Sequence, residues 1–151
     1  MQPLPHRYGV AVRATPLGGA TMESRGLSAI ATAKPAEFDG PGDRWSPETL
    51  LVGAVADCFV LTFRGIAARV GLPWTGIRCH VDGTLDRIDR ITRFTRFDLR
   101  VEVEVPEGVE TARVHEALER AEATCLITRS LIAESYLDAA VYVTAPVAEA
   151  V

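Results

Sequence analysis

Apolar and charged side chains alternate strictly from Arg96 to Val105, which is the clearest pattern in the chain. An alternation with period two predicts a strand that has one face on a core and the other in water, as in antiparallel sheets. A shorter alternating stretch, "GIRCHVDGTL" from Gly76, predicts a second strand of the same kind. The apolar face of the longer strand would hold Phe97, Leu99, Val101, Val103 and Val105, and the charged face Arg96, Asp98, Arg100, Glu102 and Glu104.

A long helix is predicted to run from a cap at Ser46 to about Val70. Ser46 is a good N-cap, Pro47 fits the first helical position, and Glu48 suits the positive end of the helix dipole. Glu48 follows the cap by two residues rather than three, so it does not complete a capping box. Gly71 is expected to end the helix. Apolar residues lie almost all the way round, which predicts burial on most sides: Leu50, Leu51, Val52, Val55, Phe59, Val60 and Leu61.

The remaining segments complete an α+β order. "RYGVAVRATPLGGATMESRGLSAIATA" predicts two or three short strands, and "KPAEFDGPGDRW" predicts a loop. A second helix is expected over about Val109–Thr124, and a short helix after Cys125. "AAVYVTAPV" is expected to close the fold as a strand. Strands, helix, strands, helix and strand in this order predict an α+β fold.

Length and composition narrow the class of protein. The 151 residues predict one domain over 1–151. A net charge of −4 with scattered arginines gives no basic patch, so we expect neither nucleic acid nor an anionic membrane as partner. No stretch approaches about twenty uninterrupted apolar residues, and the N-terminus does not resemble a secretory signal. We therefore expect a cytoplasmic protein.

Three cysteines carry the candidate chemistry: Cys58, Cys79 and Cys125. They lie far apart and form no CxxC pair, which predicts neither a disulfide scaffold nor a structural metal site. A lone helical cysteine such as Cys58 is more often a small core residue than a reactive one. Cys125 lies at a junction where helix-start amides would lower a thiol pKa. Cys79 lies in an alternating strand and is interpreted as structural.

A reactive Cys58 would need a stabilised thiolate. It lies about three turns into its helix, beyond the reach of the helix dipole, so a side chain would have to act, with arginine the obvious candidate. Spacing does not choose among four arginines: Arg13, Arg25, Arg44 and Arg129. Glu48 is either a solvated helix-start acid or the group that orients the activating arginine.

Two motifs resemble those of the OsmC/Ohr family, the osmotically inducible and organic-hydroperoxide-resistance proteins. "SPETLLVGAVADCF" resembles that family's "PEELLxAAxAxCF" helix, and "CLITRSL" resembles its second cysteine motif, "CPxSxAL" or "CLITNSL". The two motifs occur in the family's order and at a suitable separation. Length and element order also match, so the resemblance covers nearly the whole chain.

The resemblance implies an intertwined homodimer in which antiparallel sheets wrap around long central helices. It also implies a thiol peroxidase in oxidative-stress defence, with Cys58 attacking an organic hydroperoxide and Cys125 resolving the product as a disulfide. Glu48 would assist the activating arginine. A dithiol, from a lipoyl protein or a thioredoxin-like protein, would reduce the disulfide, and neither a metal nor an organic cofactor is needed.

One departure concerns the arginine. Peroxidatic members carry it in an early hairpin loop, where this chain reads "TPLGGAT". Arg13 and Arg25 flank that stretch, and Arg129 stands where the nearest subgroup has asparagine. Another arginine, for example Arg25 or Arg129, would have to take its place. The alternatives to a peroxidase are a weakly active protein that binds an apolar or electrophilic small molecule at the dimer interface, and a stress-induced dimer with inert thiols.

Overall fold

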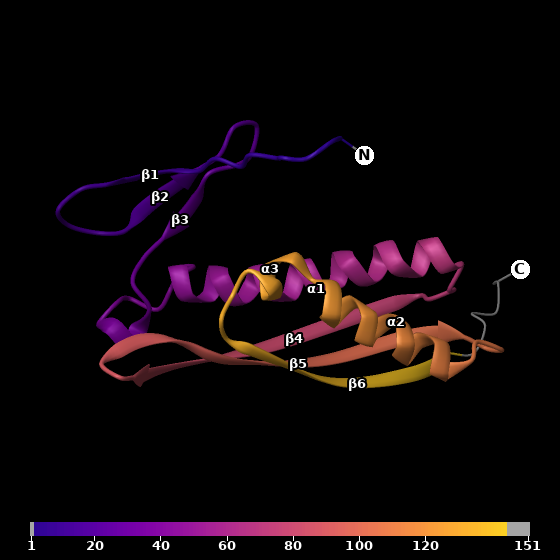
Figure 1. Ribbon diagram of the computed structural model, residues 1–151. Coiled ribbons are helices and arrows are strands. Elements are labelled where there is room, and N and C mark those ends of the chain that lie inside the picture. Colours follow the sequence, from indigo (N-terminus) through magenta and orange to yellow (C-terminus); the bar gives the residue numbers. More distant parts are fainter. Residues whose placement is uncertain (1, 145–151) are drawn as a thin grey trace, which may run out of the picture. The chain divides into compact units, whose positions relative to one another are not determined.

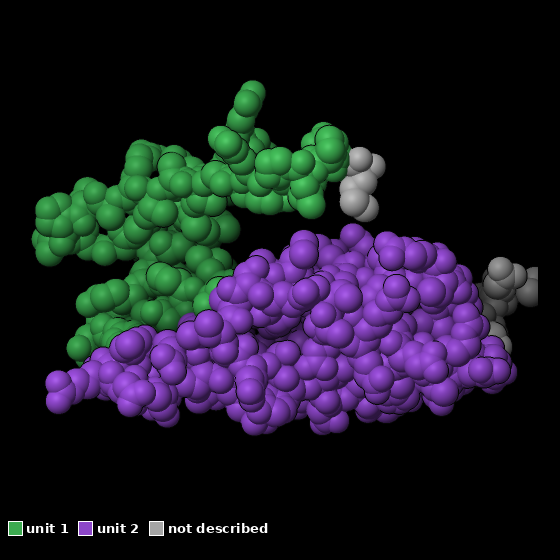
Figure 2. Space-filling model, viewed as in Figure 1, with its two compact units in different colours: residues 1–51 green, residues 52–151 purple. Residues whose placement is uncertain are grey.

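The computed structural model describes residues 2–144. The chain divides into two compact units, Met1–Leu51 and Val52–Val151 (Figure 2), and each is described here by itself. The assignment of residues 1–151 to one domain stays a prediction.

The first unit contains a three-stranded antiparallel sheet. Its strands are β1 (Ala11–Ala14), β2 (Ala20–Glu23) and β3 (Ile30–Thr32), in that spatial order. The predicted short strands are therefore confirmed, while the predicted loop contains one 3₁₀ turn, η1 (Ala36–Phe38). Within residues 2–51 only Thr32 and Ser46 are buried, so this sheet has no apolar core of its own.

Helix α1 (Pro47–Val70) begins and ends where the sequence predicts. The Ser46 hydroxyl accepts the Thr49 N–H (3.1 Å), and the Thr49 hydroxyl accepts the Ser46 N–H (2.8 Å). The two residues thus form a reciprocal cap, in which Thr49 takes the position that glutamate or glutamine holds in a capping box. At the other end Gly71 adopts φ +59°, a left-handed conformation that glycine tolerates best.

The expected burial of α1 on most sides is wrong for the single chain. Only one ridge of the helix is buried, formed by Val55, Phe59, Phe63, Ile66 and Ala67. Leu61, on another side, remains 44% exposed. By length and composition α1 could cross a membrane, contrary to our sequence-based expectation, although core helices of other proteins meet the same criterion. A helix with apolar side chains on a solvent-exposed side needs another surface to pack against.

The second unit contains the larger sheet, β4 (Gly76–Ile88), β5 (Ile91–Pro106) and β6 (Glu134–Thr144), in that order. β4 and β5 are antiparallel, but β5 and β6 are parallel, so the expectation of purely antiparallel sheets is wrong for this pair. The reason is the crossover of α2 (Thr111–Thr124) and α3 (Leu126–Arg129), which returns the chain in the direction of β5 (Figure 1). The last three residues of the predicted closing strand, 145–147, lie outside the described residues.

The β4–β5 hairpin is longer than the alternation predicted. The strands continue to a two-residue turn at Asp89 and Arg90, where φ is +51° and +66°. Both signs match the type I′ turn that suits the twist of a hairpin, but neither residue is the glycine that marks such turns in a sequence. The sequence pattern therefore did not predict this turn.

The core of the second unit lies between the sheet and the helices on one of its faces (Figure 1). The five apolar residues predicted for the inner face of β5 are all buried, which confirms the alternation. At Gly83 the sheet and α1 approach closely, because an added Cβ would lie 2.7 Å from Val52 Cγ2 and 2.9 Å from Phe94 Cε1. Glycine therefore sets the distance at which α1 rests on β4.

Candidate functional site

Cys58 is half-buried on α1, beside the buried ridge that Phe59 and Phe63 form. One turn later, Thr62 Oγ1 lies 4.0 Å from Cys58 Sγ. The helix holds both side chains on the same face, since residues four apart are neighbours on a helix surface. The sulfur therefore has a fixed polar neighbour within its own helix.

Cys125 is fully buried where α2 ends and α3 begins. Its carbonyl accepts the Arg129 N–H and the Thr128 hydroxyl, both at 3.1 Å. These bonds close the single turn of α3. The backbone amides of Leu126 and Ile127, at the start of that turn, act on the Cys58 sulfur and lower the pKa of its thiol.

The pKa of the Cys58 thiol is lowered from its ordinary value. Burial acts to raise it, but hydrogen bonding from the Ile127 amide, the Cys125 thiol, the Thr62 hydroxyl and the Leu126 amide outweighs burial. Donors that face the sulfur favour its charged form, so Cys58 carries more thiolate than an ordinary cysteine at neutral pH. We had expected a side-chain cation; two of the four donors are instead backbone amides of another helix.

The pKa of the Cys125 thiol is raised. Burial is the largest cause, and its hydrogen bond to Cys58 and the charge there add to it, against bonds from Thr128. The expectation that helix-start amides would lower the pKa of this cysteine is not met in the net direction. The Thr128 amide of α3 does act to lower it, but burial and the interaction with Cys58 outweigh that effect. The two neighbouring thiols thus differ: the surroundings of Cys125 favour its neutral form, and those of Cys58 favour the thiolate.

Cys79 lies near this pair, on the inward face of β4 opposite Val101. Burial, and then the charge of Cys125, raises its pKa to about 11. His80 points to the other face, where it contacts Asp82 at 3.1 Å. The interpretation of Cys79 as an unreactive, structural thiol is therefore consistent with its surroundings.

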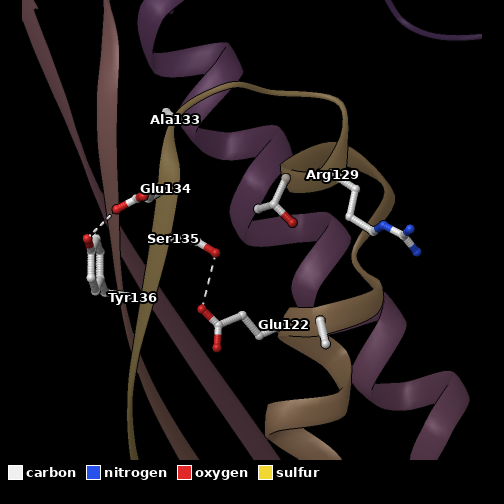
Figure 3. Close-up of a pocket in the computed structure, with 8 residues that line it drawn as sticks. Glu122, Arg129, Ala133, Glu134, Ser135 and Tyr136 are labelled. Carbon is white, nitrogen blue, oxygen red and sulfur yellow. Dashed lines mark hydrogen bonds between the residues drawn. The ribbon is translucent and has the colours of Figure 1, made fainter.

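The four candidate arginines lie in different parts of the structure. Arg129 lines an open pocket of about 460 Å³ at the junction of α2, α3 and β6, and its guanidinium extends away from Glu122 and Ser135 (Figure 3). No arginine is among the groups that lower the pKa of Cys58. The other three belong to the first unit: Arg13 pairs with Glu23, Arg44 lies near Gly19 of the "TPLGGAT" loop, and Arg25 lines a surface pocket. Their roles stay predictions.

Glu48 is half-buried in the first turn of α1. Its Oε2 is inaccessible to solvent and has no hydrogen-bond partner within residues 2–144. A buried carboxylate oxygen without a donor is costly, so this position favours a role beyond that of a solvated helix-start acid. Its proposed part in orienting an arginine stays a prediction.

The pocket of Figure 3 is bounded by two internal hydrogen bonds. Ser135 donates to Glu122 (3.1 Å), and Tyr136 donates to Glu134 (2.5 Å). The Arg96 guanidinium stacks over the Tyr136 ring, 3.6 Å from its centroid. The polar groups of the pocket are thus largely engaged with one another. In the part of the chain that the structure describes, no cluster of three or more histidine, cysteine or acidic side chains could hold a metal ion.

A family model described as "OsmC-like protein" matches residues 40–137, which include both cysteine motifs. The chain belongs to the OsmC-like family. Among curated proteins, this OsmC-like chain is 27% identical to the uncharacterized protein YmaD of Bacillus subtilis over 114 residues, which cover 74% of this chain and 75% of that protein.

Solved structures share the OsmC-like fold. An OsmC-like protein of unknown function from Vibrio cholerae, VCA0330, superposes with a TM-score of 0.84 at 18% identity, covering 90% of this chain and 100% of that chain. An organic hydroperoxide resistance protein from Elizabethkingia anophelis gives 0.74 at 14% identity (95% and 100% covered), and one from Legionella pneumophila gives 0.72 at 16% (93% and 99%). At these identities the likeness shows the fold, and the predicted α+β fold of this family is confirmed.

Proposed function

We propose that this OsmC-like protein is a thiol peroxidase that reduces organic hydroperoxides to alcohols through Cys58 and Cys125. The observation that carries the proposal is the opposite shift of two neighbouring thiols. The pKa of half-buried Cys58 is lowered, whereas that of buried Cys125 is raised. A peroxide needs a thiolate to attack it, and the resulting sulfenic acid needs a second thiol close by.

The proposed cycle has three steps. The Cys58 thiolate attacks the distal oxygen of the hydroperoxide, the O–O bond breaks, and the released alkoxide takes up one proton to leave as the alcohol. Cys58 is then a sulfenic acid, and the Cys125 thiol condenses with it to form a disulfide and one water. A dithiol, for example of a lipoyl or thioredoxin-like protein, reduces this disulfide by exchange and is itself oxidised to a disulfide. Such a cycle requires a reducing compartment, and we propose the cytoplasm.

The surroundings of Cys58 favour apolar peroxides. Leu61, three residues after Cys58 on α1, is 44% exposed, and Leu126, which follows Cys125, is 74% exposed. Alkyl or lipid groups would gain from burial against these side chains, and hydrogen peroxide would not. We therefore propose organic hydroperoxides as substrates rather than hydrogen peroxide.

We also propose that the protein acts as a homodimer. The first unit has no buried apolar side chain within its described residues, and α1 exposes Leu61. Three strands without an apolar face to bury are not stable alone, so a second copy would supply the cover. Sedimentation equilibrium should give twice the chain mass, and Leu61→Glu should shift it toward one chain mass. A wild-type protein that sediments as a single chain would contradict this.

The function is tested by following cumene hydroperoxide consumption with dithiothreitol as donor. Wild type should turn over, Cys58→Ser should not, and Cys79→Ser, the matched control, should behave as wild type. Intact mass after one equivalent of peroxide should show the loss of two hydrogens, reversed by the dithiol. Equal consumption by wild type and Cys58→Ser would overturn the proposal and favour the binding alternative.

A further inference from the structure

Thr62 has a hydroxyl group with an unusual partner for its position. In the middle of a helix, a threonine hydroxyl commonly bonds to the carbonyl one turn earlier. Two hydroxyls at helix C-termini of this chain do so: Thr124, the last residue of α2, donates to Arg120 O (2.7 Å), and Ser130, which caps α3, donates to Leu126 O (2.8 Å). Within residues 2–144, the partner of the Thr62 hydroxyl is instead the Cys58 sulfur, at 4.0 Å.

This difference leaves the Thr62 donor free for the sulfur. An O–H that already serves a backbone carbonyl has nothing further to donate, since a hydroxyl carries one proton. Because the Thr62 hydroxyl does not bond the Cys58 carbonyl, its proton is available on the side of the thiol. Thr62 is half-buried, as Cys58 is, so solvent competes only in part for that proton.

The donors approach the Cys58 sulfur from two directions, which affects how freely its side chain rotates. The α3 amides and the Cys125 thiol reach the sulfur from the α2–α3 junction, whereas Thr62 reaches it from within α1. Donors on two sides restrict rotation of the Cys58 side chain about its χ1 bond. A charged acceptor strengthens such bonds, so their hold increases once the thiol loses its proton.

We propose that Thr62 is a positioning residue, whose hydroxyl holds the Cys58 sulfur in the rotamer that faces Cys125 and the first turn of α3. It acts through Cys58 and does not itself touch the peroxide. This inference rests on the proposed function for its catalytic meaning, but the state of the thiol can be measured without any peroxide.

The test compares Thr62→Val, which keeps the shape and removes the hydroxyl, with Thr62→Ser, which keeps the hydroxyl. The rate of Cys58 alkylation by iodoacetamide is followed from pH 5 to 10 by peptide mass mapping of the full-length protein. Thr124→Val serves as the control, since it removes a helical hydroxyl that bonds to a carbonyl. Circular dichroism melts check that each variant is folded.

Thr62→Val should raise the midpoint of the alkylation profile by about 0.5–1 pH unit, the size of one ordinary hydrogen bond. Thr62→Ser should restore most of the wild-type midpoint, and Thr124→Val should not move it. A wild-type midpoint in Thr62→Val, or equal shifts in the valine and serine variants, would overturn the inference. If Cys58→Ser retained full peroxide turnover while these shifts were observed, the proposed function alone would fail.

Discussion

The thiols of Cys58 and Cys125 are neighbours, and their interaction moves the two pKa values in opposite directions: it lowers the pKa of Cys58 and raises that of Cys125. The residues are far apart in the sequence, in a long helix and at the start of a one-turn helix. Their pairing therefore depends on the fold. It distinguishes one thiol with a lowered pKa, Cys58, from two with raised pKa values, Cys125 and Cys79.

Cys58 should be the first cysteine to be alkylated. Because its pKa is lowered, its reaction with iodoacetamide should rise with pH at a midpoint below that of a free cysteine, about 8.5. Cys125 and Cys79 should react more slowly by at least about tenfold at pH 7.5, since burial holds both in the neutral form. Peptide mapping of briefly labelled native protein measures the order. Faster labelling of Cys79 would contradict it.

Ionisation of the Cys79 thiol should lower the stability of the folded protein at alkaline pH. Its pKa is about 11 in the folded protein, above the ordinary value, so the neutral thiol stabilises the fold at low pH. That contribution is present below about pH 8.5 and is lost as the pH rises through 11. Urea unfolding at pH 8 and pH 10.5 should show a larger loss for wild type than for Cys79→Ala, by roughly 1 kcal/mol after allowance for partial exposure. Identical losses would rule out this role.

Gly83→Ala should destabilise the protein by about 1–3 kcal/mol. The new methyl group would lie 2.7 Å from Val52 Cγ2 and 2.9 Å from the Phe94 ring, so α1 or the ring must shift. Gly9→Ala is the matched control, because an added Cβ there meets nothing within 4 Å. Urea denaturation of both variants measures the difference. Equal free energies of unfolding would show that the close approach carries no energetic weight.

Ser46→Ala should cost about 1 kcal/mol, as the loss of an N-cap usually does. Thr49→Val should cost a similar amount, because it removes the acceptor of the Ser46 N–H. Since each residue bonds the other's amide, the double variant should cost less than the sum of the two single variants. A thermodynamic cycle from urea unfolding tests this coupling. Strict additivity would mean that the two bonds act independently.

Arg90→Gly should stabilise the β4–β5 hairpin. Arg90 adopts φ +66°, which costs a residue with a Cβ roughly 1 kcal/mol and costs glycine little. Asp89, at φ +51°, suits the first position of such a turn better than other charged residues do. A rise in the melting temperature is expected, whereas Arg87→Gly, in the adjoining strand, should lower it.

The regular elements could be predicted because their signals are local. The alternation of β5 correctly gives its buried face, and the residues around Ser46 and Gly71 correctly give the ends of α1. The Asp89–Arg90 turn lacks glycine and so lacks the usual local signal. A polar pair between Ile88 and Ile91 was the remaining indication.

The site could be predicted only in part. Its cysteines come from two motifs, but which groups surround a sulfur depends on packing between distant segments. The amides of Leu126 and Ile127 are invisible to any side-chain pattern, because every residue except proline carries one. Thr62 could have been found: it follows Cys58 by four residues, the spacing that places two side chains together on a helix.

The parallel pairing of β5 with β6 has a consequence for how the molecule forms. Strands joined by a tight turn pair early, whereas β6 can join only after the whole α2–α3 crossover has folded back over the sheet. Cys125 lies within that crossover. We therefore expect the two thiols to meet late in folding. In a nascent or partly unfolded chain, Cys58 would lack the groups at the α2–α3 junction that lower its pKa.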